Sequence, residues 1–199
     1  MNTPSFAQAI RLNKEGVYYI EHGNYIEAMS VFARCLSIVK QVNEEFKCCP
    51  SLSESVNACS FFRKIKHGIT DMDTSDDFQD IKENFIFKNP ILIEQHSMLQ
   101  MSCGSLSFIT MYNLALSHHL YAAKHGMPNK VLRKALTLYE LAYASLLIEN
   151  QPLPPMQAIA IMNNLGQIHS ALKNNEEAQI CFQDVLVVRY ITNIRLVYD

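Results

Sequence analysis

Apolar residues recur at helical spacing along several stretches of the chain, and helix-breaking residues separate the stretches. From Phe6 to Ile20 they fall near one face, and Gly23 ends that pattern. The stretches Leu106–Ala123 and Val131–Ile148 are apolar nearly all round, as in helices that are packed between neighbours. The pattern therefore predicts an all-α chain made of successive helices.

The first and last helical stretches repeat one another at an offset of 150 positions. The matching residues are Asn13, Gly16, Asn24, Glu27, Ala28, Phe32 and Leu36 in the first copy and Asn163, Gly166, Asn174, Glu177, Ala178, Phe182 and Leu186 in the last. In each copy the asparagine at 24 or 174 precedes a glutamate by three residues, the signature of a helix N-terminus. A pair of helices is thus the repeating unit.

A middle copy lies between these two. Tyr112-Asn113-Leu114-Ala115 corresponds to Asn163-Asn164-Leu165-Gly166 at an offset of 51, whereas Ala135, Tyr139 and Ala142 correspond to Ala178, Phe182 and Val185 at an offset of 43. The change of offset places 8 extra residues, about two helical turns, around the Gly126-Met127-Pro128-Asn129 turn.

The first copy resembles a tetratricopeptide repeat, on the residues Gly16, Tyr19, Gly23, Tyr25, Glu27, Ala28, Phe32 and Leu36. The resemblance implies a right-handed α-α superhelix of about three helical hairpins, in which small residues let paired helices approach closely. We expect a single domain, 1–199, with repeats at 3–43, 104–150 and 155–198. Three residues depart from the family pattern: Cys35 in the first copy and Val185 in the third replace its usual last alanine, and Lys173 in the third replaces its turn glycine.

An insertion of about 60 residues, 44–103, follows the first repeat and is too long for a plain loop. Within it, the apolar runs 84–87 and 91–93 flank Lys88-Asn89-Pro90. They predict either a small β-hairpin or a single extended edge segment, because Pro90 lacks the N–H that a central strand needs.

Composition excludes several classes of function. With 17 basic and 19 acidic residues and a net charge of -2, the chain has no basic footprint for nucleic acid. No apolar run reaches the roughly 18 residues that a membrane span requires, so we expect a cytoplasmic protein, with a nuclear one as the alternative. The six cysteines are then expected to be reduced thiols.

Candidate chemistry is sparse. His118 and His169 share one repeat position, which suggests a metal site, but no further ligand stands at a characteristic spacing. Glycine-rich phosphate loops, nucleophile elbows and paired carboxylates are absent from the sequence. We therefore expect a non-enzyme that has neither a catalytic residue nor a cofactor.

The resemblance also implies a binding surface, because the first helices of tetratricopeptide repeats line a concave groove that grips extended peptides. The residues on or beside those positions are Asn13, Tyr112, Asn113, His119, Asn163, Asn164 and Gln167. Amide side chains suit this task because each offers a donor and an acceptor to a peptide backbone. The alternative is that Asn113 and Asn164 tie one hairpin to the next.

The expected function is that of a protein-binding scaffold or adaptor, which takes a partner peptide or helix in this groove. Two other classes stay open at this point. One is a metal- or small-molecule-binding sensor that uses His118 and His169. The other is a structural subunit that self-associates through the apolar C-terminal helix, Leu186–Tyr198.

Overall fold

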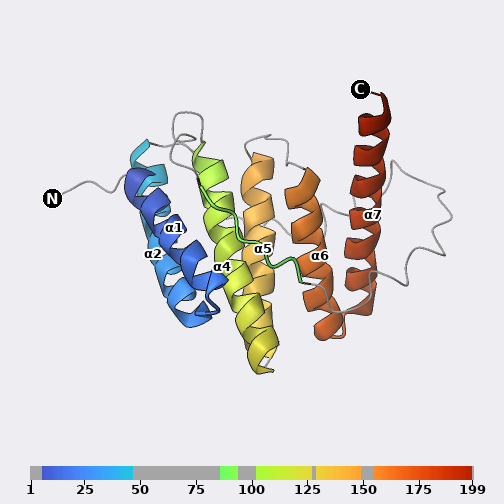
Figure 1. Cartoon of the computed structure of the whole chain (residues 1–199), viewed down its shortest axis with the longest axis horizontal. Coiled ribbons are helices and arrows are strands. Elements are labelled where there is room, and N and C mark those ends of the chain that lie inside the picture. The colour runs from blue at the N-terminus through green and yellow to red at the C-terminus, as the bar shows by residue number, and fades with distance from the viewer. Residues whose placement is uncertain (1–5, 47–85, 94–101, 127–128, 149–154, 199) are drawn as a thin grey trace. The chain divides into compact units, whose positions relative to one another are not determined.

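The computed structural model of the 199-residue chain describes residues 6–46, 86–93, 102–126, 129–148 and 155–198. Within these ranges the regular structure is entirely helical (Figure 1), which confirms the predicted all-α class. The helices are α1 (Phe6–Glu21), α2 (Tyr25–Phe46), α4 (Cys103–His125), α5 (Asn129–Ile148), α6 (Pro155–Ala171) and α7 (Asn175–Tyr198). The superhelix stays a prediction.

The described residues group into two compact units. The first unit contains α1, α2, α4 and α5 together with residues 88–93, and the second contains residues 86–87 with α6 and α7. In the first unit, α2 packs against both α1 and α4, and α4 packs against α5. In the second unit, α6 packs against α7. Each unit is therefore built from helices that follow one another in the chain.

The turn between α1 and α2 closes in a Schellman motif. The Gly23 N–H donates to the Ile20 carbonyl at 3.0 Å, and the Asn24 N–H donates to the Tyr19 carbonyl at 2.9 Å. Gly23 adopts the left-handed backbone conformation, with φ at 73°, which costs glycine little because it has no Cβ. Glycine is thus the residue that adopts the geometry of this turn at the lowest cost.

The turn between α6 and α7 has the same geometry without a glycine. Lys173, the residue equivalent to Gly23, has φ at 63°. Its N–H donates to the Ser170 carbonyl at 3.0 Å, and the Asn174 N–H donates to the His169 carbonyl at 2.9 Å. Left-handed backbone costs a residue with a side chain roughly 1–2 kcal/mol. The repeat therefore keeps its turn at the expense of local strain.

Close contacts between paired helices occur where the pattern predicts them. A Cβ added to Gly16 on α1 would lie 2.5 Å from Cζ of Phe32 on α2. A Cβ added to Gly166 on α6 would lie 2.6 Å from Cε1 of Phe182 on α7. Both phenyl rings thus occupy the space that the missing side chains leave, and the alanines that follow the same pattern, Ala28, Ala135 and Ala178, are buried.

The second hairpin is longer than the others at its turn. With the offset of 51, the end of α6 at Ala171 corresponds to Leu120, whereas α4 continues to His125. With the offset of 43, the start of α7 at Asn175 corresponds to Leu132, whereas α5 begins at Asn129. The extra residues thus lengthen both helices. The lengthened α4 brings Lys124 Nζ to 5.4 Å from the centre of the Tyr25 ring, a cation–π contact with the start of α2.

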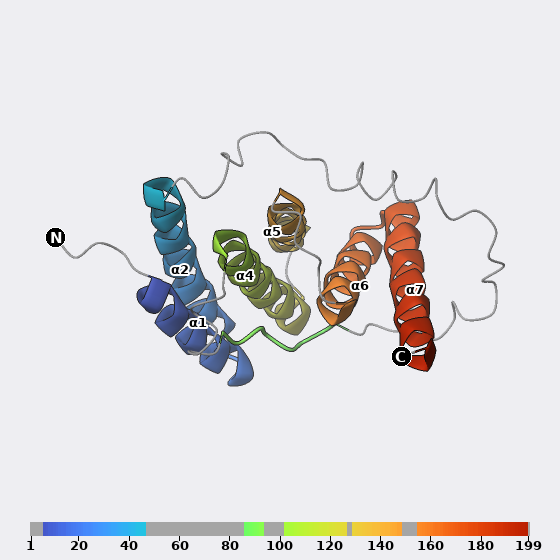
Figure 2. The same ribbon diagram turned by 90° about the horizontal axis from the view of Figure 1, so that it is seen from above.

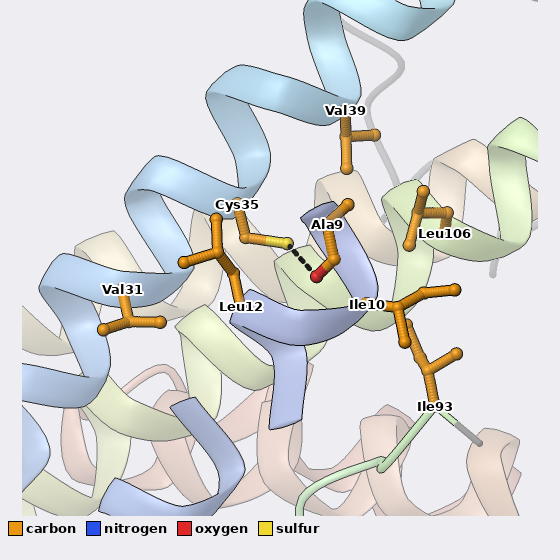
Figure 3. Close-up of a cluster of buried hydrophobic side chains, with 8 residues drawn as sticks. All are labelled: Ala9, Ile10, Leu12, Val31, Cys35, Val39, Ile93 and Leu106. Atoms are coloured by element: carbon orange, nitrogen blue, oxygen red, sulfur yellow. Dashed lines mark hydrogen bonds between the residues drawn. The ribbon is translucent and has the colours of Figure 1, made fainter. Parts of the chain in front are cut away.

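The first unit has an apolar core to which α1, α2, α4 and the extended segment contribute (Figure 3). Its buried members are Ala9, Ile10, Leu12, Val31, Cys35, Val39, Ile93 and Leu106. The Cys35 thiol lies among them and donates to the Ala9 carbonyl at 3.3 Å. Burial raises the pKa of the Cys35 thiol, which therefore behaves as a small apolar side chain. Cys103 and Cys181 are also buried, whereas Cys48, Cys49 and Cys59 lie outside the described residues.

Residues 86–93 of the insertion run as a single extended segment to which no strand is assigned. The two structures expected for residues 84–93, a small β-hairpin and a single extended edge segment, stay predictions. The rest of the insertion, 47–85 and 94–101, lies outside the described residues.

Candidate peptide-binding site

Two asparagines of the first unit hold the backbone of the extended segment. Asn113 is on α4, and its Oδ1 accepts from the Ile91 N–H at 2.8 Å while its Nδ2 donates to the Ile91 carbonyl at 2.8 Å. Asn13 is on α1, and its Nδ2 donates to the same carbonyl at 3.2 Å while its Oδ1 accepts from the Ile93 N–H at 2.9 Å. Figure 2 shows the segment passing along these two helices.

The same chemistry occurs independently in the second unit. Asn164 is on α6, at the repeat position equivalent to Asn113. Its Oδ1 accepts from the Phe87 N–H at 2.7 Å, and its Nδ2 donates to the Phe87 carbonyl at 3.2 Å. Asn163 supports this arrangement, because its Nδ2 lies 3.4 Å from Asn164 Oδ1. In both units, then, one asparagine pairs with the N–H and the carbonyl of a single residue; we call this arrangement an amide clamp.

An amide clamp works because a carboxamide carries a donor and an acceptor side by side, as a residue of an extended chain does. In extended backbone, the N–H and carbonyl of one residue point to the same side, and those of the next residue point to the other. Within the first unit, Ile91 and Ile93 are two residues apart, so their polar groups face the same side of the segment. Pro90, which has no N–H, occupies an even position, where the clamps require no donor.

The clamps are buried and uncharged. Asn13, Asn113 and Asn164 are each 0% exposed. A buried amide without a hydrogen-bond partner would cost roughly 1–3 kcal/mol. The segment avoids this cost because its backbone supplies hydrogen-bond partners to the buried asparagine side chains. The side chains of the segment contribute unequally: Leu92 is 48% exposed, whereas Ile93 is 4% exposed and packs in the core described above.

The remaining expected site residues have other environments. Tyr112 is buried and packs against Phe108 and Tyr139 in the first unit, and its burial raises its pKa. His119 is 4% exposed beside Tyr139, and burial lowers its pKa to about 4, so it is neutral at pH 7. Gln167 in the second unit is 9% exposed, and its Nε2 has no hydrogen-bond partner. Among the expected site residues described, the hydrogen bonds to the backbone of the segment are thus made by Asn13, Asn113 and Asn164.

The two histidines that suggested a metal site, His118 and His169, are kept neutral by burial. Burial, helped by the charge of Lys134, lowers the pKa of His118 to about 4. Burial also lowers the pKa of His169, whose Nδ1 lies 3.3 Å from Asn174 Nδ2. The two histidines belong to different units. Within the part of the chain that the structure describes, no three His, Cys, Asp or Glu side chains are grouped so that they could hold a metal.

One segment of the chain matches a known protein family. Residues 159–189, which comprise most of α6, the strained turn and the first half of α7, match a family model of the tetratricopeptide repeat. This part of the chain is similar to a tetratricopeptide repeat, which supports the resemblance seen in the sequence. Tetratricopeptide repeats generally mediate protein–protein interaction and are typically found in scaffolds that are not enzymes. No curated protein and no solved structure gave a significant match.

Two further findings bear on the other expectations. No helix in the described ranges is long and apolar enough to cross a membrane. The side chains beyond Tyr190 on α7 lie outside the described residues, so self-association through that helix stays a prediction.

Sequence reasoning missed the occupant of the amide clamps. It selected the three asparagines from their repeat positions but assigned them to a partner, and it treated the insertion as separate from the repeats. Residues 86–93 carry no alternation that would have indicated this role, because the even positions 86 and 92 are apolar as well as 87, 91 and 93. Only the fold brings the segment to the asparagines.

Proposed function

We propose that the protein is a binding scaffold that holds an extended segment of a partner protein by its backbone, using asparagines on the first helix of each repeat. The observation that supports this most directly is the amide clamp. Asn113 and Asn164 occupy equivalent positions in two different repeats, and each makes both hydrogen bonds to a single residue of extended chain.

The chemistry of the clamps indicates what kind of partner fits. Their hydrogen bonds go to backbone atoms, so any extended residue other than proline can make them. No charged side chain takes part in the clamp contacts described above, which favours a neutral, apolar stretch over an acidic or basic motif. The proposal is therefore an adaptor that recognises backbone conformation first and apolar side chains second.

Substitution of a clamp residue tests this function. Asn113→Asp keeps the size and the acceptor but removes the donor to the partner's carbonyl, and it places a negative charge beside that oxygen. Ile91→Pro is included in both chains that are compared, because the chain's own segment is held by the same Asn113 and would otherwise be weakened together with the peptide. Peptides selected from a random display library on the full chain with Ile91→Pro should bind at least about tenfold more weakly when Asn113→Asp is added, since one such loss is worth about 1.4 kcal/mol or more. Affinity is measured by fluorescence anisotropy.

Asn175→Asp is the matched control, because Asn175 is an exposed residue at the start of α7 and an aspartate is favourable there. Circular dichroism checks that both variants keep their helices. Selected peptides that bind the chain with Ile91→Pro equally tightly before and after the addition of Asn113→Asp or Asn164→Asp would show that the clamps are not the binding site.

A further inference from the structure

The extended segment shows how the clamp site is filled when no partner is present. Residues 88–93 belong to the insertion, which no helical hairpin needs in order to pair its helices, yet Ile91 and Ile93 occupy the clamps of the first unit. The contacts of Ile91 with these clamps are backbone contacts, which a segment of another protein could make equally well. The single deeply buried side chain of residues 86–93 is that of Ile93.

We propose that residues 88–93 are an internal ligand of the first unit, which takes the place of a partner on Asn13 and Asn113 and resembles that partner in its chemistry. The partner is then an extended peptide with two features: a residue other than proline at the position of Ile91, and a branched apolar residue two positions later, at the position of Ile93. This inference rests on the proposed function and adds the identity of the competitor and the partner's sequence pattern.

The spacing of the pattern follows from the contacts. Asn113 needs both the N–H and the carbonyl of the residue it holds, and Asn13 needs the carbonyl of that residue and the N–H two positions on. The side chain at this second position enters the core beside Ile10 and Leu106 (Figure 3). Between them, Leu92 is 48% exposed and contributes little to selection.

An internal ligand raises the concentration of partner that is needed to occupy the site. A segment tethered within the same chain competes at an effective concentration on the order of millimolar. A free peptide of identical sequence must then bind the wild-type chain with an apparent Kd near that concentration, whatever its intrinsic affinity. A change that weakens the internal segment alone should lower the apparent Kd by the same factor.

Ile91→Pro is such a change. Proline removes the N–H that donates to Asn113 but fits extended backbone, and it leaves all helices untouched. Leu92→Pro is the matched control, because it adds the same ring at an even position, whose N–H points away from the clamps. A labelled peptide of residues 86–93 is titrated into each full-length chain and followed by anisotropy. The Ile91→Pro chain should bind it about tenfold more tightly than the wild type, and the Leu92→Pro chain within about twofold of the wild type.

The same assay tests the sequence pattern. In the peptide, an aspartate at the position of Ile93 should weaken binding to the Ile91→Pro chain by about tenfold or more, whereas an aspartate at the position of Leu92 should change it by less than about threefold. Equal losses at the two positions would overturn the predicted pattern.

The possible failures can be told apart. If the Ile91→Pro chain binds the peptide no more tightly than the wild type, and Asn113→Asp still weakens that binding, the internal ligand is wrong while the proposed function stands. If peptide binding is independent of Asn113 in every chain, the proposed function itself is wrong.

Amide hydrogen exchange of the wild-type chain provides a measurement that needs no variant. A displaceable segment must open without unfolding the helices, so the Ile91 and Ile93 amides should exchange at least about a hundredfold faster than the Ala28 amide in α2. Exchange of all three at one rate would mean that the segment leaves only when the unit unfolds, which would overturn the proposal.

Discussion

Substitution of Gly16 by alanine tests the close helix crossing on which the fold depends. In an ordinary helix interior this change stabilises by about 1 kcal/mol, because alanine loses less conformational entropy than glycine. Here the new Cβ would lie 2.5 Å from Cζ of Phe32, whereas carbon atoms pack best at about 3.5–4.0 Å. The Phe32 ring is 0% exposed, so neighbours on every side resist its movement.

The balance of these terms predicts destabilisation. Overpacking of a filled core costs about 1–3 kcal/mol, and a rigid, fully enclosed ring places this site at the upper end. After the gain of about 1 kcal/mol in helix propensity, Gly16→Ala should lower the free energy of unfolding of the first unit by about 2 kcal/mol. That corresponds to roughly a thirtyfold shift in the unfolding equilibrium.

Urea denaturation followed by circular dichroism measures the change, and hydrogen exchange of the α1 amides reports the first unit alone. Ser30→Ala, on the exposed face of α2, provides a control for helix propensity and should be neutral or slightly stabilising. Adding Phe32→Leu should recover about 1–2 kcal/mol relative to the sum of the single changes. A Gly16→Ala chain that is more stable than the wild type would refute the close-crossing argument.

Three further predictions concern the turn, a buried histidine and a buried thiol. Lys173→Gly should raise the free energy of unfolding of the second unit by about 1 kcal/mol, by removing left-handed strain; an unchanged urea midpoint would contradict this. The pKa of His119 falls to about 4 on folding, so its neutral form stabilises the fold fully above its unfolded pKa of about 6.5, and this contribution is lost as pH falls toward 4. His118, whose pKa also falls to about 4, loses stability over the same range, so denaturation at pH 5 should show more than about 2 kcal/mol less stability than at pH 7, of which His119→Phe should remove about 2 kcal/mol. Cys35 should react with a thiol reagent only on unfolding, since its side chain is 0% exposed; reaction at the rate of a free thiol in the native state would contradict its burial.

The helical part of the structure follows from residues that act locally. Gly23 is favoured by a left-handed turn, and Gly16 is required by a ring on the next helix; the turn and the ring both recur at the offset of 150 residues. Such features can be predicted because each depends on a few residues within one hairpin. The first turn of α6 is a similar case, since Pro155 stands at the first helical position, where its missing N–H costs nothing.

Lys173 shows where such reasoning stops. Its side chain gives no sign of a left-handed backbone, and only the equivalence to Gly23 does so. The hydrogen bonds on either side of Lys173 reproduce those of the first turn. The two helices that they join are packed together, and this packing sets the backbone of the residue between them. Tertiary context therefore overrides the local preference of lysine.

The position of the extended segment could not be predicted for a different reason. The hydrogen bond from the Ile93 N–H to Asn13 Oδ1 joins residues 80 positions apart in the chain, and that from the Ile91 N–H to Asn113 joins residues 22 apart. Neither pairing leaves a periodic trace in the sequence, because the hydrogen bonds are made by the backbone of the segment and do not depend on its side chains. Sequence pattern therefore identified one side of the contact, the asparagines, and left its occupant undetermined.

The register of the asparagines explains why the clamps differ. Asn113 and Asn164 are equivalent, whereas Asn13 aligns with Asn163, one residue earlier in the repeat. One residue on a helix is a rotation of about 100° and a rise of about 1.5 Å, so Asn13 approaches the segment from a different direction. It therefore bridges two residues, Ile91 and Ile93, where Asn113 pairs with one. Both amides converge on the Ile91 carbonyl, whose two lone pairs accept both donors. A residue at that point is fixed from two helices at once, which is why the position of Ile91, more than any other in the segment, should decide whether an extended chain is held.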